Sequence, residues 1–230
     1  MSTRIVLIRH GETTLSAENR FAGATDVDLS DAGRAQAESL GRRLSTERLA
    51  AVYTSPLKRT RDTAAAVARP HRLAPIEDPG LREIDHGHWE TLTRAEVETR
   101  YPDEYRAWEH DPFTFAPEGG ESGLSVMARA LPIVRKIVAA HGNATVAVVS
   151  HKATIRLLLC GLLGIDPRGY RDRFDQAPCC LNLVELEDPT RARLMAYNDI
   201  NHYAGGLTSV RPHLSPWWDA HANAEQGKKG

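Results

Sequence analysis

The stretch Arg4-Ile5-Val6-Leu7-Ile8-Arg9-His10-Gly11-Glu12-Thr13 decides the fold of this chain. Four apolar, mostly β-branched residues, too few for a helix, are followed abruptly by Arg9, His10 and Gly11, which is typical of a buried strand that ends in a loop. Open α/β sheets place their chemistry at such junctions. A guanidinium offers a rigid fork of donors for phosphate, and a neutral imidazole offers a nucleophilic nitrogen. Arg9 and His10 therefore predict one wall of an anion pocket.

The composition argues against several classes of protein. The chain has 230 residues, enough for one sizeable α/β core. Its formal net charge of -1, with charged residues spread throughout, predicts neither a nucleic-acid partner nor binding to a membrane surface. The apolar strand begins at residue 4 and no apolar run approaches spanning length, so we expect a cytoplasmic protein. The three cysteines, two of them adjacent, fit reduced thiols.

Strand and helix patterns alternate along the chain, which predicts an α/β fold of three layers: a mainly parallel central sheet with helices on both faces. Ser55 as N-cap and Pro56 at the first helical position predict a helix through about Arg69. Residues 14–29 and 111–122 are expected to be loops. Further helices are expected over 31–45 after the N-cap Ser30, over 94–100 after a Thr93/Glu96 capping box, and over 103–110, 124–142 (kinked or shortened at Pro132) and 152–163; further strands are expected over 49–53, 73–77, 144–150, 181–187 and 193–197.

Polar residues from three distant segments of the sequence follow predicted strands. Arg9 and His10 follow the first strand, Arg59 lies in the first turn of the helix after the second, and His151 follows the strand 144–150. Because the carboxyl ends of parallel strands share one edge of a sheet, we expect these side chains to meet. Taken singly, His151 is more often a satisfied core histidine and Arg59 a solvated helix residue. Two arginines and two histidines at one edge, however, favour a site for a dianion.

The same positions lie in motifs that resemble the histidine phosphatase superfamily, which includes the cofactor-dependent phosphoglycerate mutases and many small phosphatases. Residues 9–13 resemble its RHG signature. Residues 55–64 resemble the second motif of the family, whose arginine corresponds to Arg59, and residues 82–90 resemble the third, whose acid corresponds to Glu83. Residues 148–151 resemble the fourth motif. With the segments 21–23 and 28–33, the resemblance covers most of residues 4–203. It implies a histidine phosphatase domain over residues 1–204. The pair Gly205-Gly206 and the Gln-Gly-Lys-Lys-Gly end predict a loosely held tail over 205–230.

The charges and the resemblance together suggest a role for each residue. His10 is expected to attack phosphorus, while Arg9 and Arg59 disfavour its protonation and stabilise the phosphoryl oxygens. The resulting phosphohistidine splits one hard displacement into two easier ones. Glu83 is the candidate acid for the leaving alkoxide and then the base for water, and His151 is expected to clamp the transferring group. No metal or other cofactor is expected, because four cationic or donor groups already surround the phosphoryl group.

Gly11, Ser16, Gly23 and Lys152 are predicted to contact the substrate. Ser16 departs from the resemblance, since many relatives carry an asparagine there that helps to bind phosphate. Lys152 stands where a small residue is common, and it adds a positive charge near the substrate. The histidines at 86 and 88 are interpreted as pocket lining rather than as a metal pair, because no carboxylate or thiol spacing completes a site.

Three functions fit these motifs, two catalytic and one non-catalytic. Hydrolysis of a small phosphorylated metabolite is favoured, because Glu83-Ile84-Asp85-His86 places an acid where the mutases carry a cation. Residues 101–108 and 119–122 resemble metal-independent phosphoserine phosphatases and relatives of α-ribazole phosphatase. The alternatives are a cofactor-dependent phosphoglycerate mutase and a non-catalytic phosphate-binding module, although a mere binder needs neither His10 nor Glu83. The physiological substrate, and whether two copies form a homodimer, stay open.

Overall fold

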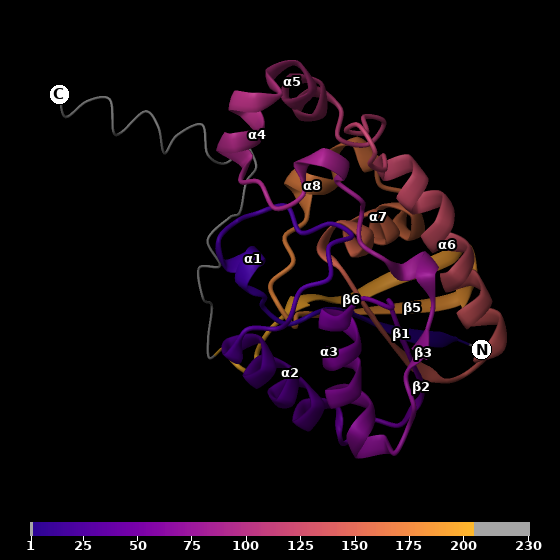
Figure 1. Cartoon of the computed structure of the whole chain (residues 1–230). Coiled ribbons are helices and arrows are strands. Elements are labelled where there is room, and N and C mark those ends of the chain that lie inside the picture. The colour runs from indigo at the N-terminus through magenta and orange to yellow at the C-terminus, as the bar shows by residue number, and fades with distance from the viewer. Residues whose placement is uncertain (1, 205–230) are drawn as a thin grey trace, which may run out of the picture.

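A sheet of six strands forms the middle layer of the computed structural model, which describes residues 2–204 (Figure 1). The strands are β1 (Thr3–Arg9), β2 (Leu49–Thr54), β3 (Ile76–Glu77), β4 (Thr145–Ser150), β5 (Leu181–Asp188) and β6 (Arg191–Asp199). Their order across the sheet is β3-β2-β4-β1-β5-β6. Neighbours from β3 to β1 are parallel, and β5 is antiparallel to both β1 and β6. The predicted α/β fold with a mainly parallel sheet is confirmed.

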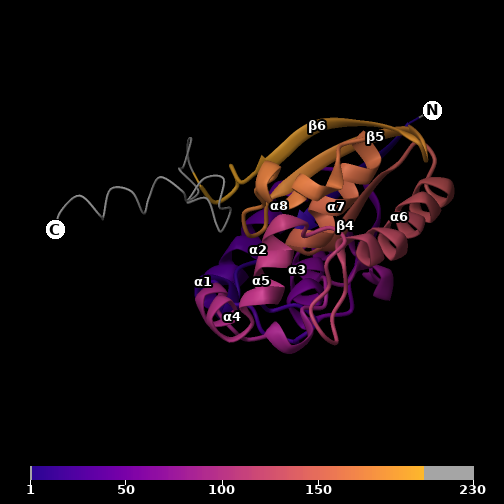
Figure 2. The ribbon, with the colours of Figure 1, turned by 90° about the horizontal axis from the view of Figure 1, so that it is seen from above.

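Helices cover both faces of this sheet. They are α1 (Thr14–Ala17), α2 (Asp31–Leu44), α3 (Lys58–Ala68), α4 (Arg94–Arg100), α5 (Pro102–His110), α6 (Gly123–Ala140), α7 (Lys152–Leu163) and α8 (Tyr170–Arg173). In Figure 1, α2 and α3 lie on one side of the sheet, and α6 and α7 lie on the other. Seen from above, α4 and α5 lie side by side and away from β5 and β6 (Figure 2). No helix among residues 2–204 is both long and apolar enough to cross a bilayer.

The alternation of side chains along β1 divides the core into two layers. Ile5 and Leu7 pack with residues of α6 and α7, whereas Val6 and Ile8 pack with residues of α2 and α3. All four are nearly inaccessible to solvent, as expected for a strand covered on both faces. Two packed faces fix the register of β1 against its neighbours, because a slip of one residue would exchange the faces.

The register between β1 and β4 places the site. Arg9 pairs with Ser150, and the backbone N–H of His10 donates to the carbonyl of Ser150 at 3.1 Å. His10 and His151 therefore leave the sheet at the same level, on neighbouring parallel strands. The pairing of β1 with β4 therefore explains why His10 and His151 lie close together, as was expected for residues that follow parallel strands.

Several details differ from the sequence predictions. Helix α3 begins at Lys58 rather than at Pro56, and its N-cap, Leu57, makes no side-chain cap, so the prediction of Ser55 as the N-cap is wrong. The Ser55 hydroxyl contacts His151 instead, because a buried ring nitrogen lies within its reach. Residues 14–29, expected to be a loop, contain α1, and α6 runs as one helix through Pro132. The expected tail over 205–230 lies outside the described residues.

A glycine sets the distance between α2 and α3. A Cβ on Gly41 would lie 2.5 Å from the carbonyl oxygen of Ala66, which is backbone and has little freedom to move. We expect Gly41→Ala to lower the free energy of unfolding by about 1–3 kcal/mol through overpacking, measured by urea denaturation. Gly142→Ala is the control, since a Cβ there meets nothing within 4 Å. Equal stability of the two variants would show that the close approach of the helices does not matter.

Candidate active site

The carboxyl edge of the parallel strands holds a cavity of about 440 Å³. The structure brings together on its wall five side chains that were predicted to act: Arg9, His10, Arg59, Glu83 and Lys152. His10 and His151 lie beside each other, with ring centroids 5.2 Å apart. His151, completely buried, lies behind the wall rather than on it. Side chains contributed by β1, α3, α7 and the loop before α4 thus converge on one space.

The hydrogen bonds of His10 determine which ring nitrogen is free. Its Nδ1 lies 2.7 Å from the carbonyl oxygen of Gly11. A carbonyl oxygen only accepts, so Nδ1 carries the proton and donates it. In the neutral ring the lone pair is then on Nε2. The Gly11 carbonyl thereby selects the tautomer in which Nε2 can act as a nucleophile.

The guanidinium of Arg59 is held from three sides, although this side chain is only 1% exposed. Its two terminal nitrogens donate to the carbonyls of Gly23 and Thr25 at 2.7 and 2.8 Å. Its Nε donates to Nδ1 of His151 at 3.2 Å. Since Nδ1 accepts, His151 is neutral with its proton on Nε2, and it donates to the Ser55 hydroxyl at 2.8 Å. His151 therefore acts in this arrangement as a support for Arg59.

Burial and positive charge act in the same direction on both histidines. Burial first, and then the charges of Arg59 and Arg9, hold the pKa of His10 well below its usual range. Burial and Arg59 likewise hold the pKa of His151 well below that range. Both rings are therefore neutral at neutral pH. An unprotonated His10 beside two guanidinium groups is the charge state that nucleophilic attack on a phosphoryl group needs.

Glu83 reaches the cavity from the loop before α4, and backbone amides hold its carboxylate. Its Oε1 accepts from the amides of Ile84 and Thr154, at 3.0 and 3.2 Å, and its Oε2 accepts from the amide of Ala153 at 3.1 Å. Ala153 and Thr154 belong to the first turn of α7, so the positive end of that helix dipole faces the carboxylate. The carboxyl group of Glu83 is thus held in a fixed position on the cavity wall.

The other predicted substrate contacts lie in different environments. Gly11 does not line the cavity: its N–H donates to the Thr63 hydroxyl at 3.1 Å and its carbonyl accepts from His10. Ser16 lines the cavity, but its hydroxyl is engaged with the backbone of Thr13 in a capping box. Gly23 lines the cavity and its carbonyl accepts from Arg59. In this structure Gly11 and Gly23 position catalytic candidates rather than offer donors to a substrate.

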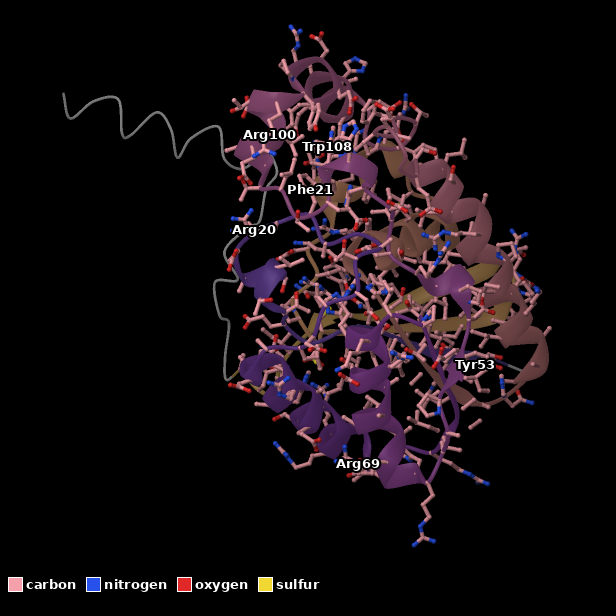
Figure 3. All side chains as sticks on the ribbon, viewed as in Figure 1. Arg20, Phe21, Tyr53, Arg69, Arg100 and Trp108 are labelled. Carbon is pink, nitrogen blue, oxygen red and sulfur yellow. The ribbon has the colours of Figure 1, made fainter. Side chains whose placement is uncertain are left out.

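Aromatic rings form a wall of the same cavity. Phe21 contacts His86 with ring centroids 4.7 Å apart, and it contacts Trp108 of α5 at 5.7 Å. Figure 3 shows Phe21 and Trp108 near each other, below the helices α4 and α5. All three rings line the cavity, as predicted for His86. Burial lowers the pKa of His86 to about 4, so this wall is uncharged at neutral pH.

Glu90 is a supporting residue whose role the sequence did not indicate. Its carboxylate accepts from the amides of Ala24 and Thr25, at 2.6 and 2.8 Å, and from the Thr25 hydroxyl. The carbonyls of Gly23 and Thr25, in the same loop, hold Arg59. Glu90 therefore fixes the loop that fixes the guanidinium. Its place in the third motif was the only available signal.

The site thus places a buried histidine near two arginines, an arrangement suited to phosphoryl transfer. A model of the histidine phosphatase superfamily (branch 1) matches residues 5–200. The chain belongs to this superfamily, so the resemblance seen in the motifs is confirmed.

Individual relatives are similar over most of the chain. Phosphoserine phosphatase 1 of Hydrogenobacter thermophilus is 39% identical over 163 residues, which are 71% of this chain and 77% of the relative. A bifunctional protein of Mycobacterium tuberculosis is 39% identical over 91% of this chain, but the chain spans only 53% of its length. A solved mycobacterial glucosyl-3-phosphoglycerate phosphatase has a TM-score of 0.79 at 29% identity, over 86% of this chain and 99% of the other. The chain is thus a phosphoric monoester hydrolase of the superfamily.

The part of the chain that the structure describes contains no group of three or more His, Cys, Asp or Glu side chains that could hold a metal ion. The prediction that His88 lines the pocket is wrong, because His88 is not on the cavity wall. Its Nε2 lies 2.9 Å from the Glu104 carboxylate, which also accepts from the indole N–H of Trp89 at 3.0 Å. His88 therefore belongs to the packing of α5 against the loop before α4.

The supporting role of Glu90, which holds the loop whose carbonyls accept from Arg59, can be tested by substitution. In Glu90→Gln one carboxylate oxygen becomes an amide donor, which faces backbone N–H groups and loosens the loop of Gly23 and Thr25. We expect kcat/KM for a phosphomonoester to fall by about tenfold to a hundredfold, because small misplacements of a positioning group are costly. Glu47→Gln, on an exposed residue, is the matched control and should leave kcat/KM unchanged. Full activity of Glu90→Gln would contradict the supporting role.

Proposed function

We propose that this protein hydrolyses small phosphomonoesters without a metal ion, through a phosphohistidine on Nε2 of His10, and that residues 1–204 form the catalytic domain. The observation that carries the proposal is the hydrogen bond from Nδ1 of His10 to the Gly11 carbonyl, which leaves Nε2 unprotonated next to two arginines. A ring with the opposite tautomer would have no lone pair on Nε2.

In the first half of the proposed reaction, Nε2 of His10 attacks phosphorus and the ester oxygen leaves. Arg9 and Arg59 stabilise the negative charge that accumulates on the phosphoryl oxygens in the transition state. The leaving alkoxide is a poor leaving group and takes a proton from Glu83 in its acid form. The bond from phosphorus to Nε2 forms as the bond from phosphorus to the ester oxygen breaks.

In the second half, the roles reverse. Glu83, now a carboxylate, takes a proton from a water molecule, whose oxygen attacks phosphorus and displaces Nε2. Inorganic phosphate leaves and the neutral ring of His10 is restored. The amides of Ala153 and Thr154 in α7 hold the Glu83 side chain in position for this step.

Support for hydrolysis over transfer to a second substrate comes from the charge beside Glu83. The run Glu83-Ile84-Asp85-His86 carries two carboxylates, and His86 is neutral because burial lowers its pKa to about 4. Of this run, Glu83 and His86 line the cavity, so a doubly phosphorylated intermediate of a mutase would meet a carboxylate and a neutral ring there rather than a cation. The proposed substrates are therefore monophosphorylated metabolites, as the names of the relatives also suggest.

The proposal predicts turnover of p-nitrophenyl phosphate in the presence of EDTA. His10→Ala should lower kcat by about a thousandfold or more, because the nucleophile is lost. The control is His110→Ala, which changes an exposed histidine on α5. Loss of activity in EDTA that added Mg²⁺ restores, or equal activity of His10→Ala, would overturn the mechanism. Formation of 2-phosphoglycerate from 3-phosphoglycerate primed with 2,3-bisphosphoglycerate, without release of phosphate, would favour the mutase.

A further inference from the structure

Beyond the phosphoryl cluster, the cavity wall carries a second group of positive charges on α7. Lys152 and Arg156 are four residues apart and so lie on the same face of this helix. Both line the cavity together with Arg9. Arg156 is only 6% exposed, so its charge is largely removed from water. Buried charges of one sign need a partner.

The partner that the described structure offers is insufficient. One oxygen of Asp175 lies 3.5 Å from the Lys152 ammonium and 3.6 Å from a terminal nitrogen of Arg156, so two cations share a single distant carboxylate oxygen. Among residues 2–204, the buried Nε atoms of Arg156 and Arg9 find no hydrogen-bond partner. Burial, and then the charges of Arg156 and Arg9, lower the pKa of Lys152 to about 7, as expected for a cation with too little negative charge nearby.

Two other arginines of the cavity have carboxylates at shorter distances, although the buried Nε of Arg171 also finds no hydrogen-bond partner in the described part of the chain. Arg20 donates to Glu18 at 2.8 Å and to Glu96 at 3.1 Å. Arg171 donates to Glu109 at 3.0 Å, and its guanidinium covers the ring of Trp108. These two arginines therefore already have close carboxylate partners. The uncompensated positive charge of the cavity lies on the side of α7.

We propose that Lys152 and Arg156 form a second anion subsite that binds a carboxylate of the substrate, while Arg9, His10 and Arg59 receive its phosphoryl group. The inference rests on the proposed function and narrows its substrates to small phosphorylated carboxylic acids. Counting Asp175, the formal charge of the subsite is one positive charge, which matches a carboxylate better than a second phosphate dianion. The planar guanidinium of Arg156 offers a fork of donors that suits the two oxygens of a carboxylate.

Two pairs of compounds test the subsite, because the carboxylate of one member is replaced by hydrogen in the first pair and by a hydroxymethyl group in the second. O-phosphoserine is compared with O-phosphoethanolamine, and 3-phosphoglycerate is compared with glycerol 3-phosphate. We expect kcat/KM to favour the carboxylate-bearing member by about tenfold or more in both pairs, the value of one charge-assisted hydrogen bond in a buried site. Lys152→Gln and Arg156→Gln should each reduce this ratio by about tenfold.

Asp175→Asn is expected to change the ratio of kcat/KM values in the opposite direction. It removes the negative charge that competes with the substrate, so the ratio should rise above that of the unchanged protein. Because Lys152 is only half-buried and Asn keeps the size of Asp, these two variants decide the question even if Arg156→Gln does not fold. Lys136→Gln, the same side-chain change at an exposed position of α6, should leave the ratio unchanged.

The outcomes distinguish a failure of the proposed phosphatase activity from a failure of the carboxylate subsite. Failure to hydrolyse p-nitrophenyl phosphate would overturn the proposed function itself. Hydrolysis of that compound, combined with ratios near one in both pairs or with ratios that Lys152→Gln and Asp175→Asn do not change, would overturn the carboxylate subsite and leave the phosphatase activity in place.

Discussion

The buried guanidinium of Arg59 is the constraint on which the site depends. An arginine that is 1% exposed stays in a folded protein only when its donors are satisfied, and here two carbonyls of the loop at 23–25 and one ring nitrogen of His151 do so. Burial, and then this charge, hold the pKa of His10 and of His151 well below the usual range, so both rings are neutral. Glu90 and Ser55 belong to the same network, since one holds the loop and the other holds His151.

The cavity that surrounds this network is divided by charge. Its aromatic wall, formed by Phe21, His86 and Trp108, is neutral, whereas the wall formed by β1 and α7 carries Arg9, Lys152 and Arg156. Helix α7 contributes twice, because the amides of its first turn hold Glu83 and the side chains of Lys152 and Arg156 leave positive charge uncompensated. In the proposed mechanism, proton transfer by Glu83 and recognition of the substrate carboxylate therefore depend on the same helix.

The residues that end strands could be predicted from the sequence, because an apolar run that stops at Arg9 or before His151 marks both the strand and its edge. Contacts between distant loops could not. Ser55 before Pro56 is a typical helix start, yet a tertiary contact with His151 takes its hydroxyl. Arg156 belongs to none of the motifs. Its spacing from Lys152 predicts that both lie on one face of a helix, but the sequence does not show that this face is buried against the cavity. The antiparallel direction of β5 depends on chain connections that periodicity does not encode.

The central claim is that the free enzyme presents a neutral His10 with its proton on Nδ1. Nitrogen NMR of the ¹⁵N-histidine-labelled protein without phosphate, with the His10 signals assigned by their loss in His10→Ala, measures both the charge and the tautomer. At pH 6.5, where an ordinary histidine is about half protonated, we expect a neutral His10 ring with the proton on Nδ1. A ring that is half or more protonated at this pH, or a proton on Nε2, would contradict the account.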